Sequence, residues 1–465
     1  MRLLLSLALV LLAAAPVRAQ LDERLRIGGQ YEFYSGLRVG AAPDLLTARN
    51  RAELLLTFAY DRGRIALRPR LDYDALGERL DGDLREAFID VYFSRVDLRL
   101  GRQQIVWGET DGTFVTDLLS PLDLREFLAQ PFDDLRLGVT AANATWYASD
   151  DIRLTGVLIP RRPTTQLPEP GSAWYPLPGA AFGVLPIELT DAAPQDSTLG
   201  GAETALRLTY GGLDRTDVAV LWINGFNRLP AFRKGIAFEA AVPPVFAAVT
   251  PEYRRRQVFG LTVETLALDP FVLRGETAFH TSYLLDQPLD LPESLEDLGE
   301  IFDLPIELPI DLGDLVGLLD PEFRDALERG FLVEKPFAQS AIGVERAFGQ
   351  HLVRVQGIGS LVFDWDERVA QDRFEAGLTA FWTAPFRRQT LTAQAFVYYN
   401  VGEDYWLNPS LTYAVQDGLN ATLGAHVFGG EGGTQDLAGL LREPAFSFAT
   451  YDANDFVYLR VAYSF

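Results

Sequence analysis

Segments in which apolar and polar side chains alternate recur along most of this chain of 465 residues. In one example, Leu206, Leu208 and Tyr210 are separated by Arg207 and Thr209. A period of two residues is typical of a β-strand, because successive side chains point to opposite faces. The pattern predicts many strands with one apolar and one polar face. Alternation alone does not decide whether the apolar face points into a soluble core or outward to lipid.

The amino-terminal residues predict export from the cytoplasm. Arg2 is followed by an apolar run over residues 3–15 and then by Val17, Arg18 and Ala19. A basic start, a short apolar run and small residues at the end are typical of a cleavable signal peptide, here residues 1–19. The apolar run is too short for a transmembrane helix.

No later apolar run is long enough to span a bilayer as a helix. A membrane protein without such helices has to be a closed barrel, because lipid offers no hydrogen-bond partners to an open sheet edge. We therefore predict that residues 20–465 form one all-β, transmembrane, antiparallel up-and-down barrel. Aromatic residues at strand ends favour this location, because they gather at lipid–water interfaces. These residues are Tyr60, Tyr73, Phe93, Tyr147, Tyr210, Trp382 and Tyr399.

Eighteen strands can be placed on the sequence, with sixteen as the alternative. The connections between them alternate short and long, as in barrels with short periplasmic turns and long external loops. The predicted strands span about residues 27–37, 49–60, 63–74, 84–95, 96–104, 135–148, 151–160, 201–211, 214–224, 254–268, 270–284, 336–348, 351–363, 371–383, 387–400, 404–415, 418–429 and 452–465.

The chain ends on a strand whose apolar face comprises Val457, Leu459, Val461, Tyr463 and Phe465. This ending resembles the closing strand that bacterial outer-membrane barrels present to the barrel assembly machinery. The resemblance implies that Tyr463 and Phe465 serve as an assembly signal. It also implies that the protein resides in the outer membrane of a Gram-negative bacterium, in contact with its lipids and lipopolysaccharide.

The long external loops are predicted at about 105–134, 161–200, 225–253, 285–335 and 430–451. Four of them are too apolar for freely solvated loops, so we expect some to fold into the barrel mouth. The alternative is a lid packed above the membrane. Residues 321–329 have the pattern of a short helix that begins with Pro321 after a cap at Asp320.

The formal net charge of −23 argues against nucleic-acid binding, which uses basic surfaces. Acidic loops would be bridged by divalent cations to anionic lipopolysaccharide, or they keep the surface solvated. Both interpretations stay open. The chain has no cysteine and therefore no disulfide or thiolate site.

One motif lies in and after the fifth predicted strand. Its residues are Gly101, Arg102, Gln103, Trp107, Gly108 and Glu109, followed by Pro121 and Asp123. The motif resembles an outer-membrane family of unknown function that is usually encoded beside RND-type (MMPL-like) permeases and a periplasmic lipoprotein-sorting-like carrier. It is more distantly similar to the alginate-export porins. The resemblance implies a porin-like conduit that works with such a permease on lipids or other hydrophobic compounds.

The motif also has a physical interpretation. Gly101 and Gly108 permit bends or bulges of the backbone, and Trp107 lies at the interface or folds back into the lumen. Arg102 is expected to pair with Glu109 and Asp123 and to pin an inward loop. Direct contact of these residues with a solute is the alternative.

The charged faces of the strands are predicted to line the lumen. They create a transverse field that selects solutes, or they form cross-strand ion pairs that stabilise the wall. Their signs are balanced, which argues against strong selectivity for anions or cations. The candidates are Arg68, Arg70, Asp72, Glu86, Asp90, Arg99, Arg207, Glu264, Arg274, Glu276, Arg354, Arg373, Glu375 and Arg460.

No catalytic or metal-binding pattern is predicted. His280, His351 and His426 lie near the ends of separate strands without the spacing of a metal site. His280 is expected to line the lumen, and nothing orients it toward Ser282 as a catalytic pair. We therefore predict a protein without a cofactor that is not an enzyme.

The sequence predicts an outer-membrane channel for hydrophobic or amphiphilic small molecules. The alternative is a structural or adhesion barrel whose acidic loops bind lipopolysaccharide or surface polymer. The solute, the direction of transport and the oligomeric state are not determined by these patterns.

Overall fold

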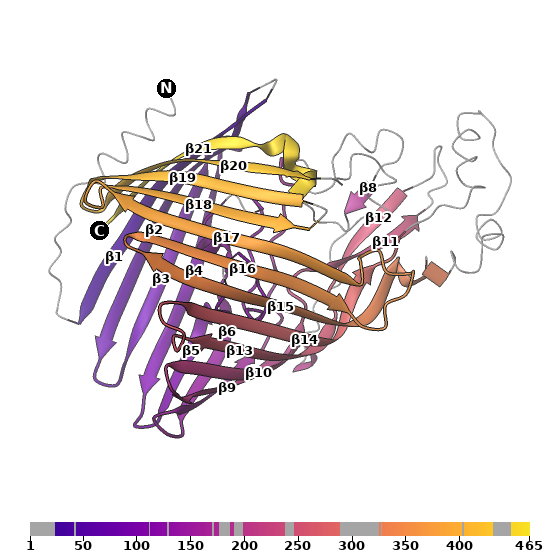
Figure 1. Ribbon diagram of the computed structural model, residues 1–465, viewed down its shortest axis with the longest axis horizontal. Helices are drawn as coiled ribbons and strands as arrows, with labels where there is room; N and C mark the ends of the chain where they lie inside the picture. Colours follow the sequence, from indigo (N-terminus) through magenta and orange to yellow (C-terminus); the bar gives the residue numbers. More distant parts are fainter. Residues whose placement is uncertain are drawn as a thin grey trace.

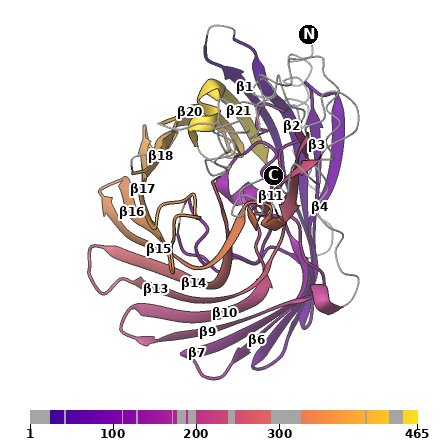
Figure 2. The same ribbon diagram turned by 90° about the vertical axis from the view of Figure 1, so that its right-hand side faces the viewer.

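The computed structural model describes residues 24–40, 43–110, 112–127, 130–169, 172–175, 187–189, 199–237, 246–288, 325–326, 328–401, 404–430 and 448–465. Within these residues, eighteen antiparallel strands form one sheet whose first strand pairs with its last, so the sheet closes into a barrel (Figures 1 and 2). The barrel strands are β1 (Leu25–Arg38), β2 (Leu45–Tyr60), β3 (Gly63–Asp74), β4 (Arg79–Tyr92), β5 (Val96–Gln103), β6 (Val139–Tyr147), β7 (Ile152–Ile159), β9 (Glu203–Leu213), β10 (Thr216–Phe226), β13 (Arg255–Thr265), β14 (Val272–Asp286), β15 (Leu332–Phe348), β16 (His351–Val362), β17 (Phe374–Phe386), β18 (Leu391–Asn400), β19 (Asp404–Gln416), β20 (Leu419–Gly430) and β21 (Phe456–Ser464).

The predicted barrel of eighteen strands is confirmed, and each predicted strand overlaps one observed strand. The last strand is shorter than predicted and begins at Phe456, because Phe448–Asn454 form a 3-10 helix, η3. At the closure, the backbone N–H of Gly29 donates to the carbonyl of Phe465 at 3.1 Å. The N–H of Phe465 donates back to the Gly29 carbonyl at 3.0 Å. Hydrogen bonds therefore join the sheet edges as far as the last residue.

The two ends of the barrel differ, as the alternation of short and long connections predicts. At one end, eight turns join neighbouring strands, and the carboxyl terminus lies at this short-turn end, on the left in Figure 1. The longer connections leave from the opposite end, which we call the long-loop end. There β8 (Ile187–Leu189), β11 (Ala231–Ala237) and β12 (Phe246–Glu252) form a separate sheet that was not predicted.

The outward faces of the strands are apolar. Val457 and Leu459 of β21 are each 41% exposed, and Phe465 is 48% exposed. Exposure of a whole band of such side chains is the pattern of a barrel that faces lipid. Tyr147 is an exception to the predicted aromatic belt: it lines a cavity inside the barrel, and its hydroxyl donates to Asp97 at 2.8 Å.

Some expectations fall outside the described residues. The predicted signal peptide, residues 1–19, is among them, as are residues 289–324 of the predicted loop 285–335, including the predicted helix cap at Asp320. Asp325 and Arg329 are helical and form an ion pair at 3.0 Å, in agreement with the predicted short helix. None of the helices in the described ranges is long and apolar enough to cross a membrane.

Gly101 provides a test of the strand geometry. Its φ of +125° disfavours any other residue, and an added Cβ would lie 2.2 Å from the carbonyl oxygen of Ala87. We expect G101A to destabilise the barrel by about 1–3 kcal/mol, the usual magnitude for a strained backbone position. The measurement is urea-induced unfolding of the refolded protein in lipid vesicles.

G357A is the matched control, because no atom lies within 4 Å of the Cβ position of Gly357. Equal stability of G101A and G357A would contradict the prediction.

Candidate functional site in the barrel lumen

The connection between β5 and β6 enters the barrel. We call residues 104–138 the inner segment; its purple trace crosses the interior in Figure 2. Its two arms lie against each other, since the N–H of Asp123 donates to Leu135 at 2.7 Å and the N–H of Leu137 donates to Pro121 at 2.8 Å. The prediction that a long connection folds into the lumen is confirmed for this segment, and the alternative of a lid is wrong for it.

The carboxylate of Glu276 on β14 holds the tip of the inner segment. It is 3% exposed and accepts hydrogen bonds from the backbone N–H groups of Glu109, Thr110 and Thr116. The Thr116 hydroxyl donates to the same carboxylate at 2.6 Å. On the next strand, the side-chain amide of Gln339 donates to the carbonyls of Phe114 and Val115 at 3.2 Å each. A charged acceptor buried with several donors strongly restricts the backbone around it.

A second anchor joins the inner segment to the opposite wall. Asp134 accepts hydrogen bonds from Arg51 on β2 at 3.1 Å and from Arg70 on β3 at 2.9 Å. Arg85 on β4 donates to the backbone carbonyls of Asp134 and Arg136 at 2.9 Å and 2.6 Å. These three arginines are buried, so removal of one partner would leave uncompensated charge inside the barrel.

Apolar side chains fill the space between the inner segment and the wall. Ile105, Trp107, Val115, Leu118 and Leu119 form one buried cluster with inward-facing residues of the strands. The strand residues are Val139, Ala141, Val157, Ile159, Ala205, Leu221, Ile223, Val258, Ala278 and Ala341. This part of the inner face is apolar, which the expectation of a polar lumen missed. Val, Ile and Ala occupy inward positions in these strands, and this pattern was the signal in the sequence that could have revealed the apolar inner face.

Three charged residues of the motif form ion pairs, but their partners differ from those predicted. Arg102 pairs with Asp83 at 3.3 Å, Glu109 with Arg207 at 3.4 Å and Asp123 with Arg125 at 2.8 Å. The predicted pairing of Arg102 with Glu109 and Asp123 is therefore wrong. The chain turns inward after Gln103, which carries Glu109 across the lumen to β9.

The remaining motif residues have structural contacts. Gln103 is fully buried, and its amide donates to the Ala141 carbonyl at 3.1 Å. Trp107 is 5% exposed and folds back into the lumen, one of its two predicted positions. A Cβ added to Gly108 would lie 2.9 Å from Cβ of Asp117, so the glycine permits close approach of the two arms.

Burial and a neighbouring arginine shift the pKa of Asp117, in the inner segment, in opposite directions. Its carboxylate lies 2.5 Å from Arg136. Burial raises the pKa of Asp117, and the charge of Arg136 offsets only part of this rise.

Most predicted inward charges lie in cross-strand ion pairs or anchor the inner segment. Arg68 and Arg70 share Glu53, Asp72 binds Arg51, Asp90 binds Arg64 and Arg99, Arg274 joins Glu264 and Glu345, Arg354 binds Glu345, and Arg460 binds Glu32. Glu86 accepts the N–H of Gln104 at 3.1 Å, and Glu375 accepts the Ser360 hydroxyl at 3.1 Å.

Arg373 is different, because it lies before β17 and is exposed there. Sequence reasoning also missed Arg51, Arg85 and Asp134 of the second anchor. It missed Arg153, which lines a cavity beside Trp107, and Arg228, which donates to the Leu119 carbonyl at 3.1 Å. Of these, Arg51 and Arg153 occupy inward positions of the strand alternation, which was the signal that could have found them.

Each of the three histidines lies beside an aromatic side chain, and the three lie on separate strands. His280 is buried and stacks edge-on to Tyr283, with ring centroids 5.5 Å apart. A register shift between His280 and Tyr283 separates it from Ser282, whose hydroxyl instead contacts Glu334. In the part of the chain that the structure describes, no three His, Asp or Glu side chains could hold a metal ion together.

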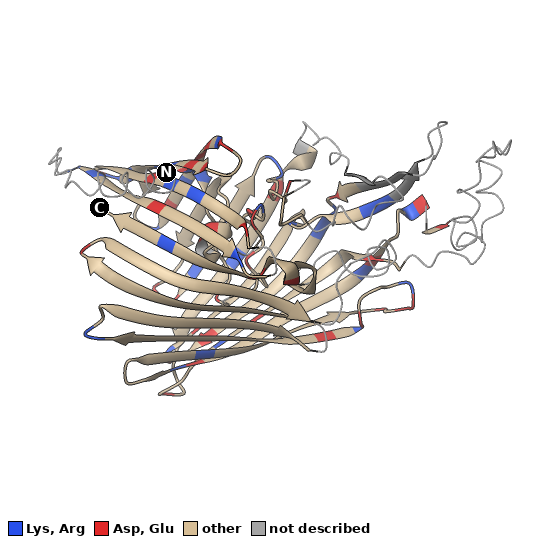
Figure 3. Ribbon diagram, turned by 90° about the horizontal axis from the view of Figure 1, so that it is seen from above, with Lys and Arg blue, Asp and Glu red and all other residues tan. Residues whose placement is uncertain are grey.

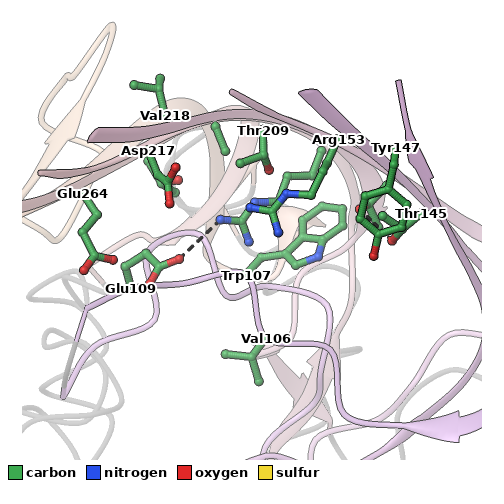
Figure 4. A pocket seen from close by; sticks show the side chains of 14 residues that line it. Val106, Trp107, Glu109, Thr145, Tyr147, Arg153, Thr209, Asp217, Val218 and Glu264 are labelled. Atoms are coloured by element: carbon green, nitrogen blue, oxygen red, sulfur yellow. Dashed lines mark hydrogen bonds and ion pairs between the residues drawn. The ribbon is translucent and has the colours of Figure 1, made fainter. Parts of the chain in front are cut away.

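Cavities border the inner segment among the described residues. One, of about 420 Å³, lies toward the short-turn end and is lined by Trp107, Glu109 and polar residues of β6, β7, β9, β10 and β13 (Figure 4). A second, of about 400 Å³, lies between Gln104, Arg136, Arg274 and Arg354. These two cavities are bordered mainly by charged and polar side chains.

The third cavity, of about 360 Å³, has an aromatic wall. β18 and β20 contain no Asp, Glu, Lys or Arg, so this side of the lumen carries few charges. Trp406 stacks on His426 with ring centroids 5.7 Å apart and donates to its Nδ1 at 3.0 Å. The aromatic wall comprises Tyr34, Phe381, Phe396, Trp406, His426 and Tyr458.

A family model described as "Protein of unknown function (DUF1302)" matches residues 46–300, which is more than half of the chain. The chain belongs to the DUF1302 family. The match includes the whole inner segment and every strand from β3 to β14, so the anchors of the inner segment on β3, β4 and β14 lie inside the family region. No curated protein matches this DUF1302 chain.

Solved structures of outer-membrane channels share the fold of this DUF1302 chain. OccAB2 of Acinetobacter baumannii is 8% identical with a TM-score of 0.51, and 95% of this chain aligns with 98% of that one. OccK2 (OpdF) of Pseudomonas aeruginosa, solved in complex with glucuronate, is 9% identical with a TM-score of 0.51 and the same coverage. At such low identity the likeness concerns the fold, which is that of an outer-membrane porin.

The anchor at Asp134 generates a pH-dependent prediction. Burial alone would raise the pKa of Asp134, but the charges of Arg51, Arg70 and Arg85 outweigh it and lower the pKa from 3.8 to about 2. A lowered pKa stabilises the folded state above the unfolded pKa, and the stabilisation is lost as the pH falls through the folded pKa. We expect D134N to reduce the free energy of unfolding at neutral pH by about 2 kcal/mol.

The difference in the free energy of unfolding between D134N and the unmodified protein should shrink as the pH is lowered from 3.8 toward 2. Asp134 then takes up a proton in both the folded and the unfolded state. Urea-induced unfolding in vesicles across this range measures it. D150N, at an exposed turn residue, is the control. A deficit that does not change with pH would contradict the assignment of the effect to the carboxylate charge.

Proposed function

We propose that this chain is a porin-like channel of the outer membrane that passes hydrophobic or amphiphilic small molecules. The observation that carries the proposal is the inner segment, which narrows the lumen while cavities of about 360–420 Å³ stay open beside it. A barrel with a purely structural role would have no need of an inner segment anchored to both walls by buried charges. The porin fold of the similar structures supports the same conclusion.

The two sides of the lumen support an amphiphilic solute. The aromatic wall offers flat apolar surface, on which a ring or hydrocarbon chain gains contact area. Strands β2–β5 and β13–β16 instead carry charges of both signs that form ion pairs. Figure 3 shows basic and acidic residues distributed along the strands of the barrel. A molecule with an apolar body and a polar end would contact both sides at once.

The proposal includes the partners that the family resemblance implies. These are an inner-membrane permease of the RND type and a periplasmic carrier, which would deliver the solute to the barrel or receive it. Tyr463 and Phe465 would present the closing strand to the assembly machinery. Both residues lie at the short-turn end, where the carboxyl terminus meets Gly29 of β1.

Single-channel conductance in a planar bilayer tests the channel directly. We expect the intact protein to conduct weakly, because the inner segment narrows the lumen. E276Q should raise the conductance, because the amide has lost the charge that holds Glu109, Thr110 and Thr116. D217N removes a negative charge from the lumen without touching the inner segment and is the control.

Equal conductance of E276Q and D217N would show that lumen charge, and not release of the inner segment, causes any increase. Silence of the intact protein and of E276Q would contradict the channel and favour the structural or adhesion barrel. Deletion of residues 290–330 in parallel shows whether that segment closes the mouth.

The aromatic wall generates a prediction about solute preference. We expect W406A to reduce the uptake of naphthyl glucoside into proteoliposomes by roughly 2- to 10-fold, the loss of one aromatic contact. Uptake of glucose, which lacks the naphthyl group, should fall less than uptake of naphthyl glucoside. W146A is the control, because Trp146 points outward and is 49% exposed. A parallel loss for both sugars would mean that Trp406 supports the barrel and does not recognise the solute.

A further inference from the structure

Four neighbouring strands sort their charges by sign in the cavity beside Trp107 and Glu109. Arg153 of β7 faces Thr209 of β9, and Arg207 of β9 faces Thr155 of β7, so the two arginines are diagonal neighbours on one face. On the next two strands, Asp217 of β10 lies directly opposite Glu264 of β13. Like charges in such positions repel each other.

The arginine pair lacks full compensation within the protein. Arg207 has one carboxylate partner, Glu109, at 3.4 Å. Arg153 forms no ion pair with any residue in the described ranges. Glu264 is already bound to Arg274 at 3.2 Å, on the side away from β9. Of the two guanidinium groups, only that of Arg207 contacts a carboxylate among the described residues, and that contact is long.

The cavity beside the arginines has the size and the lining of a small-molecule site. Its volume of about 420 Å³ falls within the usual range for ligand pockets. In Figure 4, Arg153 and the ring of Trp107 lie at one side, while Asp217 and Glu264 lie at the other. The hydroxyl-bearing residues Thr155 and Thr209 also line it. Guanidinium, hydroxyl and aromatic groups thus converge on the same space.

We propose that Arg153 and Arg207 bind the oxyanion group, a carboxylate or a phosphate, of a small amphiphile whose apolar part lies against Trp107. The planar guanidinium fork matches the two oxygens of such a group. The inference rests on the proposed function and specifies the charged end of the solute. The site lies on the short-turn side of the inner segment, so the solute meets it on one side of the narrowed region.

Glu109 acts as an internal competitor for this site. Its backbone N–H is fixed by Glu276, and its carboxylate reaches Arg207 from the inner segment. Burial raises the pKa of Glu109, while Arg207 opposes the rise, so the carboxylate is held in an unfavourable place by one partner. An incoming oxyanion would take over that contact.

Calorimetric titration of the folded protein in detergent micelles tests the site with four probes. Benzoate and phenyl phosphate carry the oxyanion, benzamide is the neutral analogue and benzylammonium is the cation. We expect both oxyanions to bind, and benzamide and benzylammonium to bind at least about tenfold more weakly, because a charged hydrogen-bonded contact is lost. The ratio of benzoate to phenyl phosphate identifies the preferred oxyanion.

Three variants separate recognition from folding. R153Q and R207Q should each weaken benzoate by about tenfold or more. E109Q breaks the same Glu109–Arg207 contact as R207Q but should leave benzoate binding equal or tighter. R354Q is the control, because Arg354 is a lumen arginine that does not line this cavity. The heat-dependent shift of each variant on a gel verifies the barrel.

Equal binding of benzoate and benzamide would overturn the proposal, as would folded R153Q and R207Q that keep the affinity of R354Q. Tighter binding of benzylammonium than of benzoate would overturn it in favour of a cation site at Asp217 and Glu264. The outcomes are distinct from the conductance test. A barrel that conducts but does not bind benzoate would contradict the oxyanion site and support the channel. A barrel that binds benzoate but does not conduct would support the site and contradict the channel.

Discussion

Every other feature of the molecule depends on the hydrogen bonds between β1 and β21. Lipid cannot satisfy the edge of a sheet, so an open sheet with an apolar outer face would not be stable in a membrane. The bonds between Gly29 and Phe465 complete the pairing at the last residue of the chain. Closure creates an interior, which a flat sheet does not have, and this interior holds the inner segment and the cavities.

The side chains of the interior differ along the barrel axis and between opposite parts of the wall. Toward the long-loop end, the inner segment packs apolar residues such as Trp107 and Leu119 against small inward side chains, which resembles the core of a soluble protein. Toward the short-turn end, the same strands carry Arg207, Thr209 and other polar residues around a cavity. The inner segment thus packs against apolar side chains of the wall, and Glu276 holds its polar tip beside the cavity.

Buried charge gives the inner segment its position. Glu276 and Asp134 are single carboxylates that collect several donors each, from opposite sides of the lumen. Such contacts gain their strength from the low dielectric around them, and the same environment makes an unpaired charge costly. The segment therefore has one favourable position, which is why a loop can serve as a fixed part of a channel wall. The aromatic wall and the arginine pair then face the space that the segment leaves open.

The fold was predictable because the sequence patterns that specify it lie within short stretches of the chain. A period of two, turn residues at regular intervals and the absence of apolar helices specify the strands, their order and the outward face. The count of eighteen came from placing the strands one by one, and the alternation of short and long connections supported it. The separate sheet of β8, β11 and β12 was not predicted, because its strands lie in loops without a sustained alternation.

The site was predictable only in part. The sequence by itself determined that charges such as Arg70, Asp90 and Arg274 face the lumen, since the face of a residue follows from its position in the alternation. The tertiary structure alone decided which charges meet. Glu109 binds Arg207 and not Arg102, because the path of the inner segment across the lumen depends on contacts with strands more than a hundred residues away along the chain, such as β14. No local pattern encodes such a path, because the curvature of the closed barrel brings those strands within reach.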